Sequence, residues 1–276
     1  MTYDVLGPGP LDYLPCRYAG SKLLFRGPRR SLDASYVAFL GSTETYGKFI
    51  ETPYPALVED TLGIPCANFG QINAGIDAFA HDPFVIDAAG RADVTVIQVL
   101  GAHNMTNRFY SVHPRRNDRF LQPATLLKTI YREVDFADYH FTRHLLGALV
   151  KVSAERFEVV RQELQDAWKA RMRLLLNQIG GKTILLWFSE RAPDHDRMGP
   201  RRIGTDPLFI TRAMMEEIAP LATEVIEVVA SPRACAAGTE GMIFSEMDAP
   251  AAAEVMGPIA HAEAAAAVSA ALQRML

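Results

Sequence analysis

The stretch "AFLGSTETYG", residues 38 to 47, runs from an apolar segment into a turn that holds three aliphatic hydroxyl side chains, Ser42, Thr43 and Thr45. A hydroxyl held where a parallel strand breaks into a helix can attack an acyl carbon once a nearby base removes its proton. The same hydroxyls commonly accept hydrogen bonds from free N–H groups at the start of a helix. The stretch therefore indicates either a nucleophile or a capped turn.

Two further turns carry groups that could stabilise a developing oxyanion. "NFGQINAG" follows a second apolar segment, and backbone N–H groups near Asn73 and Gly75 could point at negative charge there. "GAHN" follows a third apolar segment, where the side-chain amide of Asn104 or the ring of His103 could donate a hydrogen bond. A plain strand-to-helix turn also explains these glycines, so both interpretations stay open.

A candidate base lies far along the chain, where His261 follows "GPIA" at the start of an alanine-rich segment. The helix dipole disfavours a charged imidazole at a helix N-terminus, which keeps the ring neutral and able to accept a proton. One histidine among seven is weak support by itself. Its importance depends on where the strands place it.

A basic cluster, "NRFYSVHPRRNDRF", follows the third apolar segment. Its four arginines, Arg108, Arg115, Arg116 and Arg119, could bind a phosphate, a sulfate or a carboxylate. They could equally form a solvated loop paired with acidic neighbours. The segment therefore predicts substrate-binding residues only under the first interpretation.

The elements that must position these groups can be read from the apolar pattern. Five short runs have the length of strands buried on both faces: 35 to 41, 64 to 70, 93 to 101, 182 to 189 and 223 to 231. Helical patterns alternate with them: one ending at Gly63, one over about 73 to 90, a long stretch from about 123 to 179, one in "DPLFITRAMMEEIAPLA", and one at the C-terminus. This alternation predicts an α/β fold, a three-layer α/β/α sandwich with a five-stranded parallel sheet, whose ligands bind beyond the carboxyl ends of the strands.

The stretch from 138 to 179 is too long for a simple crossover and predicts a long helix that Gly180 and Gly181 end. Its apolar residues recur at helical spacing: Phe157, Val160, Leu164, Trp168, Met172 and Leu175. Packing on the domain is one interpretation of this stripe, and a dimerisation arm or a lid is the other.

The length of 276 residues and the 49% share of hydrophobic residues fit one domain, residues 1 to 276, with an N-terminal arm over 1 to 33 and a helical insertion over 117 to 179. A formal charge of −4 gives no reason to expect nucleic acid or anionic lipid as a partner. We expect a small-molecule substrate, and a homodimer through the long helix as the protein partner if the stripe is an interface.

The N-terminus holds no apolar run of signal-peptide length, so we expect a cytoplasmic protein without a membrane anchor. Cys16, Cys66 and Cys235 are widely spaced and form no C-x-x-C pair, which argues against a disulfide framework and a zinc site. We expect no metal and no cofactor.

Taken in order, these turns resemble the SGNH or GDSL hydrolase superfamily over most of the chain. That resemblance implies a five-stranded parallel sandwich with a nucleophile after the first strand, a glycine after the second, an asparagine after the third, and an aspartate and histidine before the last helix. The family's G-D-S-x-T-x-G becomes "GSTETYG" here, with Thr43 at the nucleophile position and Ser42 at that of the aspartate. A shift of one residue would make Ser42 the nucleophile. The second-block glycine falls on Asn73, with Gly75 two residues later, and G-x-N-D becomes "GAHN".

The largest departure is at the family's D-x-x-H, which here reads Pro258-Ile-Ala-His261 and lacks the aspartate. Glu254, Asp248 or a main-chain carbonyl would have to orient the histidine instead. The sequence segments "GSTETYG", "GAHNMTNRFYSVHPRRNDRF" and "DPLFITRAM" also resemble those of an uncharacterised, mainly alphaproteobacterial family of proteins. That second resemblance implies no particular chemistry.

The resemblance implies an esterase or acyltransferase that forms an acyl-enzyme on Thr43 or Ser42, with His261 as base. Asn104 and the backbone near Asn73 and Gly75 would stabilise the oxyanion. The alternative is a protein without hydrolytic activity that binds or transfers an anionic, phosphorylated or sulfated, sugar or nucleotide through its arginine-rich loop. That alternative accounts better for the missing aspartate.

Overall fold

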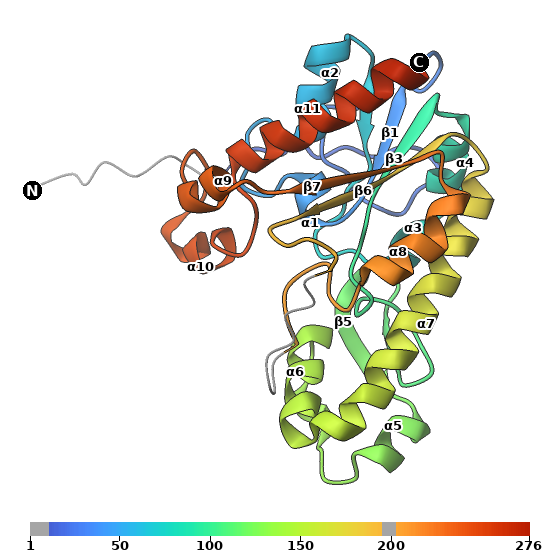
Figure 1. Cartoon of the computed structure of the whole chain (residues 1–276), viewed down its shortest axis with the longest axis vertical. Helices are drawn as coiled ribbons and strands as arrows, with labels where there is room; N and C mark the ends of the chain where they lie inside the picture. Colours follow the sequence, from blue (N-terminus) through green and yellow to red (C-terminus); the bar gives the residue numbers. More distant parts are fainter. Residues whose placement is uncertain (1–10, 195–202) are drawn as a thin grey trace, which may run out of the picture.

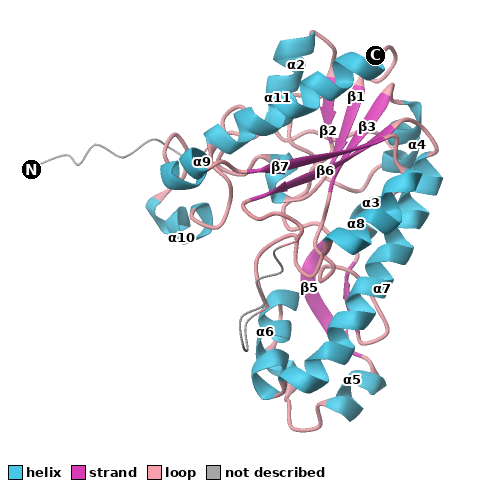
Figure 2. Ribbon diagram, viewed as in Figure 1, coloured by secondary structure: helices cyan, strands magenta, loops and turns pink. Residues whose placement is uncertain are grey.

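The computed structural model describes residues 11–194 and 203–276, so the start of the predicted N-terminal arm lies outside the described residues. A five-stranded parallel sheet forms its centre, in the order β2-β1-β3-β6-β7 (Figures 1 and 2). Its strands are β1 (Val37–Leu40), β2 (Cys66–Asn68), β3 (Val94–Gln98), β6 (Thr183–Ser189) and β7 (Glu224–Val229). Each lies inside one of the five predicted runs, and the predicted α/β sandwich is confirmed.

Alternating side chains of the strands divide the core into two layers. Val37, Val96 and Leu186 face one layer together with α2 (Tyr54–Leu62), α9 (Pro232–Ala237) and α11 (Pro258–Met275). Ala38 and Ile97 face the other layer. Its helices are α3 (Asp77–Ala80), α4 (Pro83–Arg91), α7 (Ala154–Ile179) and α8 (Arg212–Ile218). The period of two along each strand thus gives the sheet two buried faces, as its apolar runs require.

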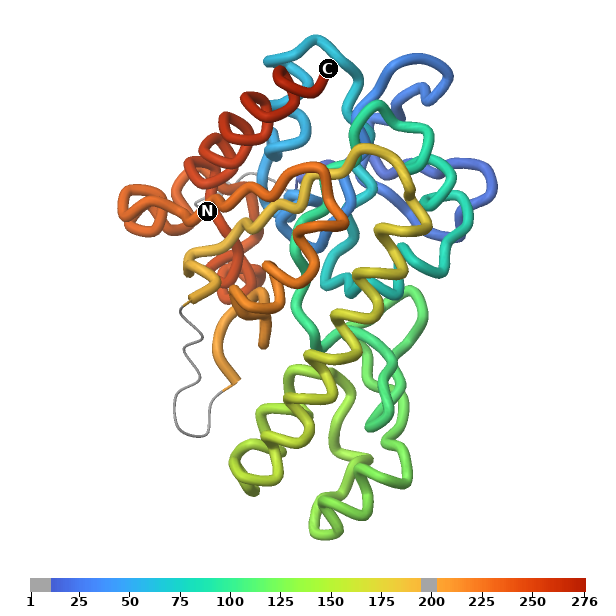
Figure 3. The backbone as a smooth tube through the Cα atoms, turned by 45° about the vertical axis from the view of Figure 1, so that its right-hand side comes forward, coloured from blue at the N-terminus to red at the C-terminus, as the bar shows by residue number. Residues whose placement is uncertain are grey.

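The chain between β3 and β6 builds a separate lobe below the sheet, drawn in green to yellow-green in Figures 1 and 3. It contains the antiparallel strands β4 (Tyr110–His113) and β5 (Arg116–Pro123), α5 (Thr125–Ile130), the short 3-10 helix η1 (Phe136–Asp138) and α6 (Thr142–Val152). The helix α7 runs from this lobe back along the sheet. The remaining short elements are α1 (Thr43–Tyr46), η2 (Ala219–Leu221), η3 (Glu246–Asp248) and α10 (Ala249–Ala252).

Three helix predictions need correction. The expected helix over 73 to 90 is two helices, because Asp82 begins α4 by accepting hydrogen bonds from Phe84 and Val85 N–H groups, with Pro83 as its first residue. The segment from 117 is not helical throughout, since residues 116–123 form strand β5. The stretch from 138 to 179 is also interrupted, at Ser153, whose hydroxyl caps α7.

The end of the long helix and its apolar stripe follow the sequence pattern. Helix α7 ends at Ile179, and Gly180 adopts the left-handed conformation with φ 64°. The six residues of the stripe are fully buried within the chain: Phe157, Val160, Leu164, Trp168, Met172 and Leu175. The stripe therefore packs within the hydrophobic core of this chain, as the first of the two interpretations expected. Among the helices of the described ranges, none has the length and apolar character that crossing a membrane requires.

Candidate functional site

A cavity of about 680 Å³ opens beyond the carboxyl ends of the central strands. Its wall includes residues that follow β1, β2, β3 and β6 and residues of the loop before α11. Those that carry polar or titratable side chains are Ser42, Thr43, Glu44, Lys48, Asn73, Gln98, His103, Asn104, Asp118, Thr142, Arg143, Ser189, Glu190, Thr205, Asp206 and Glu254. This is the position at which parallel α/β sheets bind their ligands.

Thr43 is the first residue of α1, directly after the end of β1. Its Oγ1 accepts a hydrogen bond of 3.0 Å from the main-chain N–H of Asn73, and it lies 3.2 Å from Asn73 Oδ1, to which it can donate. Asn73 has φ 55°, a left-handed conformation that asparagine tolerates better than most residues. The turn after β2 therefore holds the hydroxyl of Thr43 from two sides.

The turn around Thr43 is capped by a side chain that the sequence did not reveal. Gln98 Oε1, at the end of β3, accepts hydrogen bonds from Ser42 N (3.0 Å), Thr45 N (3.3 Å) and Thr45 Oγ1 (2.7 Å). Ser42 makes no side-chain capping bond. A Cβ on Gly41 would lie 1.9 Å from Thr45 Oγ1, so only glycine fits there. Thr45 is thus structural, while the hydroxyls of Ser42 and Thr43 are available at the cavity.

Asn104 lies beside Asn73 in the cavity wall. Its Nδ2 donates to the Asn73 carbonyl at 3.0 Å, and its Oδ1 accepts from the hydroxyl of Thr142 at 2.6 Å. Gly75 is placed differently, because its N–H donates to Asn117 Oδ1 and a Cβ on it would lie 1.6 Å from the Asn104 carbonyl oxygen. The structure therefore brings Thr43, Asn73 and Asn104 together, and gives Gly75 a packing position.

His261 is completely buried and is not part of the cavity wall. Its Nδ1 accepts a hydrogen bond of 3.1 Å from the main-chain N–H of Tyr54, and its Nε2 lies 3.8 Å from Glu44 Oε2. Burial lowers the pKa of His261 to about 3, so the ring is neutral at pH 7. With Nδ1 as an acceptor, the proton of the neutral ring is on Nε2. The ring contacts Glu44 rather than the expected Glu254 or Asp248.

Glu44 is the member of this pair that lines the cavity. Burial raises the pKa of Glu44 to about 8, and its Oε2 accepts a hydrogen bond of 3.3 Å from the Met256 N–H. The contact between Glu44 and His261 is therefore one between a neutral carboxyl group and a neutral imidazole at pH 7. Sequence reasoning missed Glu44 because it occupies an unspecified position of the "GSTETYG" block.

The other histidine at the site, His103, does line the cavity, with a relative exposure of 7%. Its Nδ1 is buried without a hydrogen-bond partner and lies 4.0 Å from Asp206 Oδ1. Burial lowers the pKa of His103, which keeps its ring neutral at pH 7. Asp206 was not among the predicted residues, although it is the first residue of "DPLFITRAM", because it lies more than a hundred positions after His103 and nothing in that motif indicates a contact with a histidine.

The four predicted anion-binding arginines do not line this cavity. Arg108 forms an ion pair with the buried carboxylate of Glu163, and the guanidinium of Arg119 lies 5.8 Å from the centre of the Phe141 ring. Arg115 and Arg116 are exposed on the lobe. The cations of the cavity wall are instead Lys48 and Arg143, and Arg143 Nη1 is paired with Asp206 at 3.0 Å.

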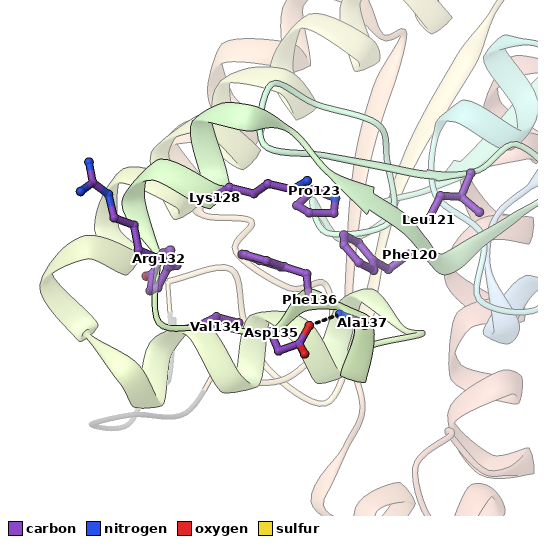
Figure 4. A pocket seen from close by; sticks show the side chains of 10 residues that line it. Phe120, Leu121, Pro123, Lys128, Arg132, Val134, Asp135, Phe136 and Ala137 are labelled. Atoms are coloured by element: carbon purple, nitrogen blue, oxygen red, sulfur yellow. Dashed lines mark hydrogen bonds between the residues drawn. The ribbon is translucent and has the colours of Figure 1, made fainter.

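A second cavity, of about 470 Å³, lies in the lobe between β5 and the segment after α5 (Figure 4). Aromatic and aliphatic side chains such as Phe120, Leu121 and Phe136 form much of its wall, with Lys128 and Arg132 at the side. The Asp135 carboxylate accepts a hydrogen bond from Ala137 N–H, the dashed line in Figure 4. Among the described residues that line this second cavity there is no histidine, so the candidate nucleophile and base are those of the first cavity.

No group of His, Cys, Asp and Glu side chains suited to a metal ion occurs within residues 11–194 and 203–276. Cys16, Cys66 and Cys235 are free thiols. The polar side chains around the first cavity include hydroxyl, amide, carboxyl and imidazole groups, together with the cations of Lys48 and Arg143. Together they can carry out proton transfer and nucleophilic attack.

Comparisons with solved structures identify similar chains at low sequence identity. The lipase Lip_vut3 from a goat rumen metagenome is 12% identical, with a TM-score of 0.46 over 86% of this chain and 97% of the lipase. A protein from Lactobacillus plantarum is 13% identical, with a TM-score of 0.44 over 88% and 98%. A carbohydrate esterase family 2 enzyme with a carbohydrate binding domain, from Corynascus thermopiles (Myceliophthora fergusii), is 12% identical, with a TM-score of 0.38 over 90% and 68%.

No curated protein matches the sequence. One family model, described as "Domain of unknown function (DUF6473)", matches residues 1–276. The match spans the sheet, the lobe and the loop before α11, so it includes every element around the first cavity. The chain therefore belongs to the DUF6473 family.

Proposed function

We propose that this chain is an acyl-ester hydrolase or acyltransferase that forms an acyl-enzyme on Thr43. The setting of Thr43 Oγ1 carries the proposal: it lies in the wall of the 680 Å³ cavity and accepts a 3.0 Å hydrogen bond from the Asn73 N–H. Asn104 is tied to the same Asn73 through its amide. A fixed hydroxyl next to an amide donor, within one cavity, is the arrangement that acyl transfer requires.

The reaction would proceed in two halves. Thr43 Oγ1 attacks the acyl carbon while a base takes its proton, and negative charge develops on the former carbonyl oxygen. Asn104 Nδ2 uses one of its two hydrogens for the Asn73 carbonyl, so the second can stabilise this oxyanion. Collapse of the intermediate releases the alcohol, which takes the proton, and leaves an ester on Thr43. Water, or an acceptor alcohol, then attacks that ester and restores the hydroxyl.

The order of these groups along the chain supports an SGNH-like mechanism. Thr43 follows β1, Asn73 follows β2 and Asn104 follows β3, as the resemblance to that superfamily implies. Ser42 is the competing nucleophile, since it also lines the cavity. The β-carbon of threonine restricts χ1 and crowds attack, so a Thr43→Ser variant should be at least as active as the wild type.

Labelling by a fluorophosphonate, with the adduct located by peptide mass mapping, tests the proposal. We expect the adduct on Thr43, its loss in Thr43→Ala and its retention in Ser42→Ala, with hydrolysis of p-nitrophenyl acetate following the same order. An adduct on Ser42 would move the nucleophile by one residue.

Absence of both labelling and turnover would refute the proposal. A thermal-shift screen with nucleotides and with phosphorylated or sulfated sugars would then test the alternative, because a binding protein gains stability from its ligand by mass action. The double variant Arg115→Ala with Arg116→Ala tests whether the arginine-rich loop binds such a ligand, since both arginines are exposed and neither lines the cavity. Loss of the ligand-induced stabilisation in this variant would support the alternative.

A further inference from the structure

Two histidines are candidates for the base: His103 lines the same cavity as Thr43, and His261 lies 3.8 Å from Glu44, the residue after Thr43. They differ in which ring nitrogen is available. His261 accepts the Tyr54 N–H at Nδ1, and its Nε2 faces Glu44 in a fully buried position. The lone pair of His261 is therefore occupied, and its proton points at a carboxyl group. A ring in this state cannot accept a proton from Thr43 unless both contacts rearrange.

His103 presents the opposite arrangement. Its Nδ1 is completely buried beside Asp206, while Nε2 has no hydrogen-bond partner among the described residues. Since His103 lines the cavity although Nδ1 is buried, the edge that carries Nε2 is the one that a ligand can reach. We propose that His103, held in orientation by the carboxylate of Asp206, is the base that takes the proton of Thr43.

Asp206 is well placed to be the orienting carboxylate. Its Oδ1 accepts the Leu208 N–H at 3.2 Å and lies 4.0 Å from His103 Nδ1, while its Oδ2 accepts from Arg143 at 3.0 Å. The main-chain carbonyl of Asp206 also accepts from the Ser189 hydroxyl at 2.8 Å. A distance of 4.0 Å is longer than a hydrogen bond, and catalytic contacts of this kind commonly shorten when substrate binds.

The His103 ring lies close to the main chain of Gly101. A Cβ on Gly101 would lie 2.8 Å from His103 Nδ1 and 2.9 Å from its Cε1, so the ring rests directly on the glycine backbone. The same Cβ would also lie 2.8 Å from the Leu208 N atom. Gly101 thus lets the imidazole and the loop that carries Asp206 approach each other.

Proton transfer follows from this arrangement. Thr43 Oγ1 loses its proton to His103 Nε2 as it bonds to the acyl carbon, and the imidazolium donates its Nδ1–H to Asp206. Nε2 then returns the proton to the departing alkoxide, and the same exchange activates the water or acceptor alcohol of the second half. Asp206 acts as a positioning residue that selects the tautomer with Nε2 unprotonated.

This inference rests on the proposed function and identifies His103 as the general base of the proposed reaction. His103→Gln should lower the rates of fluorophosphonate labelling and of p-nitrophenyl acetate turnover by roughly 10²-fold or more, the usual contribution of a general base. Asp206→Asn should lower both rates, and Asp206→Glu should restore part of the loss. His81→Gln is the matched control, because His81 is an exposed histidine outside the cavity.

The pH dependence of the labelling rate distinguishes a catalytic role of His103 from a purely structural one. The charged groups that influence His103 are Asp206 after β6, Arg143 on α6 and Asp118 on β5. The labelling rate of the wild type should rise with pH through one ionisation, and His103→Gln should abolish that step. By NMR, the His103 ring should titrate at lower pH in Asp206→Asn than in the wild type, because a nearby carboxylate favours the imidazolium.

The possible failures are distinguishable. A wild-type chain that is neither labelled nor active would overturn the proposed function and this inference with it. Normal wild-type labelling, with His103→Gln labelled within about threefold of it and an unchanged pH profile, would overturn the inference alone. In that case a folded His261→Gln variant without labelling would identify His261 as the base.

Discussion

Arg26 provides the sharpest test of how the chain holds the region of Thr43 in place. This arginine belongs to the N-terminal segment and has a relative exposure of only 7%. Its guanidinium donates to four main-chain carbonyl oxygens at the end of α1 and in the loop that follows: those of Tyr46, Gly47, Ile50 and Glu51. No carboxylate is among these partners, so the charge is stabilised by carbonyl dipoles.

Arg26→Ala removes the donors and leaves these carbonyl groups without partners in a largely buried place. A single hydrogen bond to a charged group contributes about 1.5–3 kcal/mol, but bonds that share one side chain do not add up. A buried acceptor left without a partner costs about 1–3 kcal/mol, and since several carbonyl groups lose their partner together we expect a loss of stability of about 3–5 kcal/mol. For a domain of this size it corresponds to a decrease in Tm of roughly 10 °C.

Urea denaturation followed by tryptophan fluorescence measures the effect, since Trp168 and Trp187 are both fully buried and should report unfolding. Lys22→Ala is the matched control, because Lys22 is an exposed cation of the same segment and should change stability by less than about 0.5 kcal/mol. Arg26→Lys should lie between the two, since a lysine keeps the charge but lacks the planar fork. A loss for Arg26→Ala no larger than for Lys22→Ala would refute the reasoning.

Two further predictions concern the cavity wall. Gly75→Ala places a Cβ 1.6 Å from the Asn104 carbonyl oxygen and should destabilise the protein by about 2 kcal/mol or more. Gly147→Ala is the control, because no atom lies within 4 Å of the added Cβ, and it should stabilise α6 by about 0.5–1 kcal/mol. Equal effects of the two substitutions in urea denaturation would contradict this explanation. Glu44 has a raised pKa of about 8, so the folded state holds a proton that the unfolded state releases above pH 4.5, and stability falls as pH rises from about 4.5 to 8. Glu44→Gln lacks this loss and should be more stable than the wild type at pH 8 but not at pH 5, and a stability difference that does not vary with pH would disprove the shift.

The sheet could be predicted from the sequence because each strand is a short apolar run between turn residues. All residues of the central strands β1, β3 and β6 are buried, so the local sequence pattern and the tertiary contacts both require apolar residues there. The C-terminal ends of α2 and α7 were equally clear, since Gly63 and Gly180 both adopt left-handed conformations. Strand β5 was not predicted because its charged sequence, "RNDRFLQP", buries few side chains, and because its main partner is the short strand β4.

Site residues could be predicted from the sequence only where they lie in the turn that follows a predicted strand. Thr43 and Asn104 lie in the turns that follow β1 and β3, so the fold alone places them at the carboxyl ends of these strands. Glu44, Gln98 and Asp206 could not be found in this way, because their roles depend on contacts between residues far apart in the chain. His261 was placed correctly at the start of α11, but the partners of its ring nitrogens could not be read from the sequence.

The path of α7 bears on how this architecture can vary. Trp168 in α7 donates its indole N–H to the carbonyl of Leu100 at 2.8 Å, next to the turn that carries His103, and Arg171 bonds Asp77 at 2.8 Å. At the other end of the lobe, Thr142 holds the amide of Asn104. The lobe therefore supplies part of the wall and the support of the cavity. A chimera in which a shorter crossover replaces residues 117–179 would lose these contacts. The sheet and the lobe therefore have to be moved together in protein engineering, and we expect them to occur together in related chains.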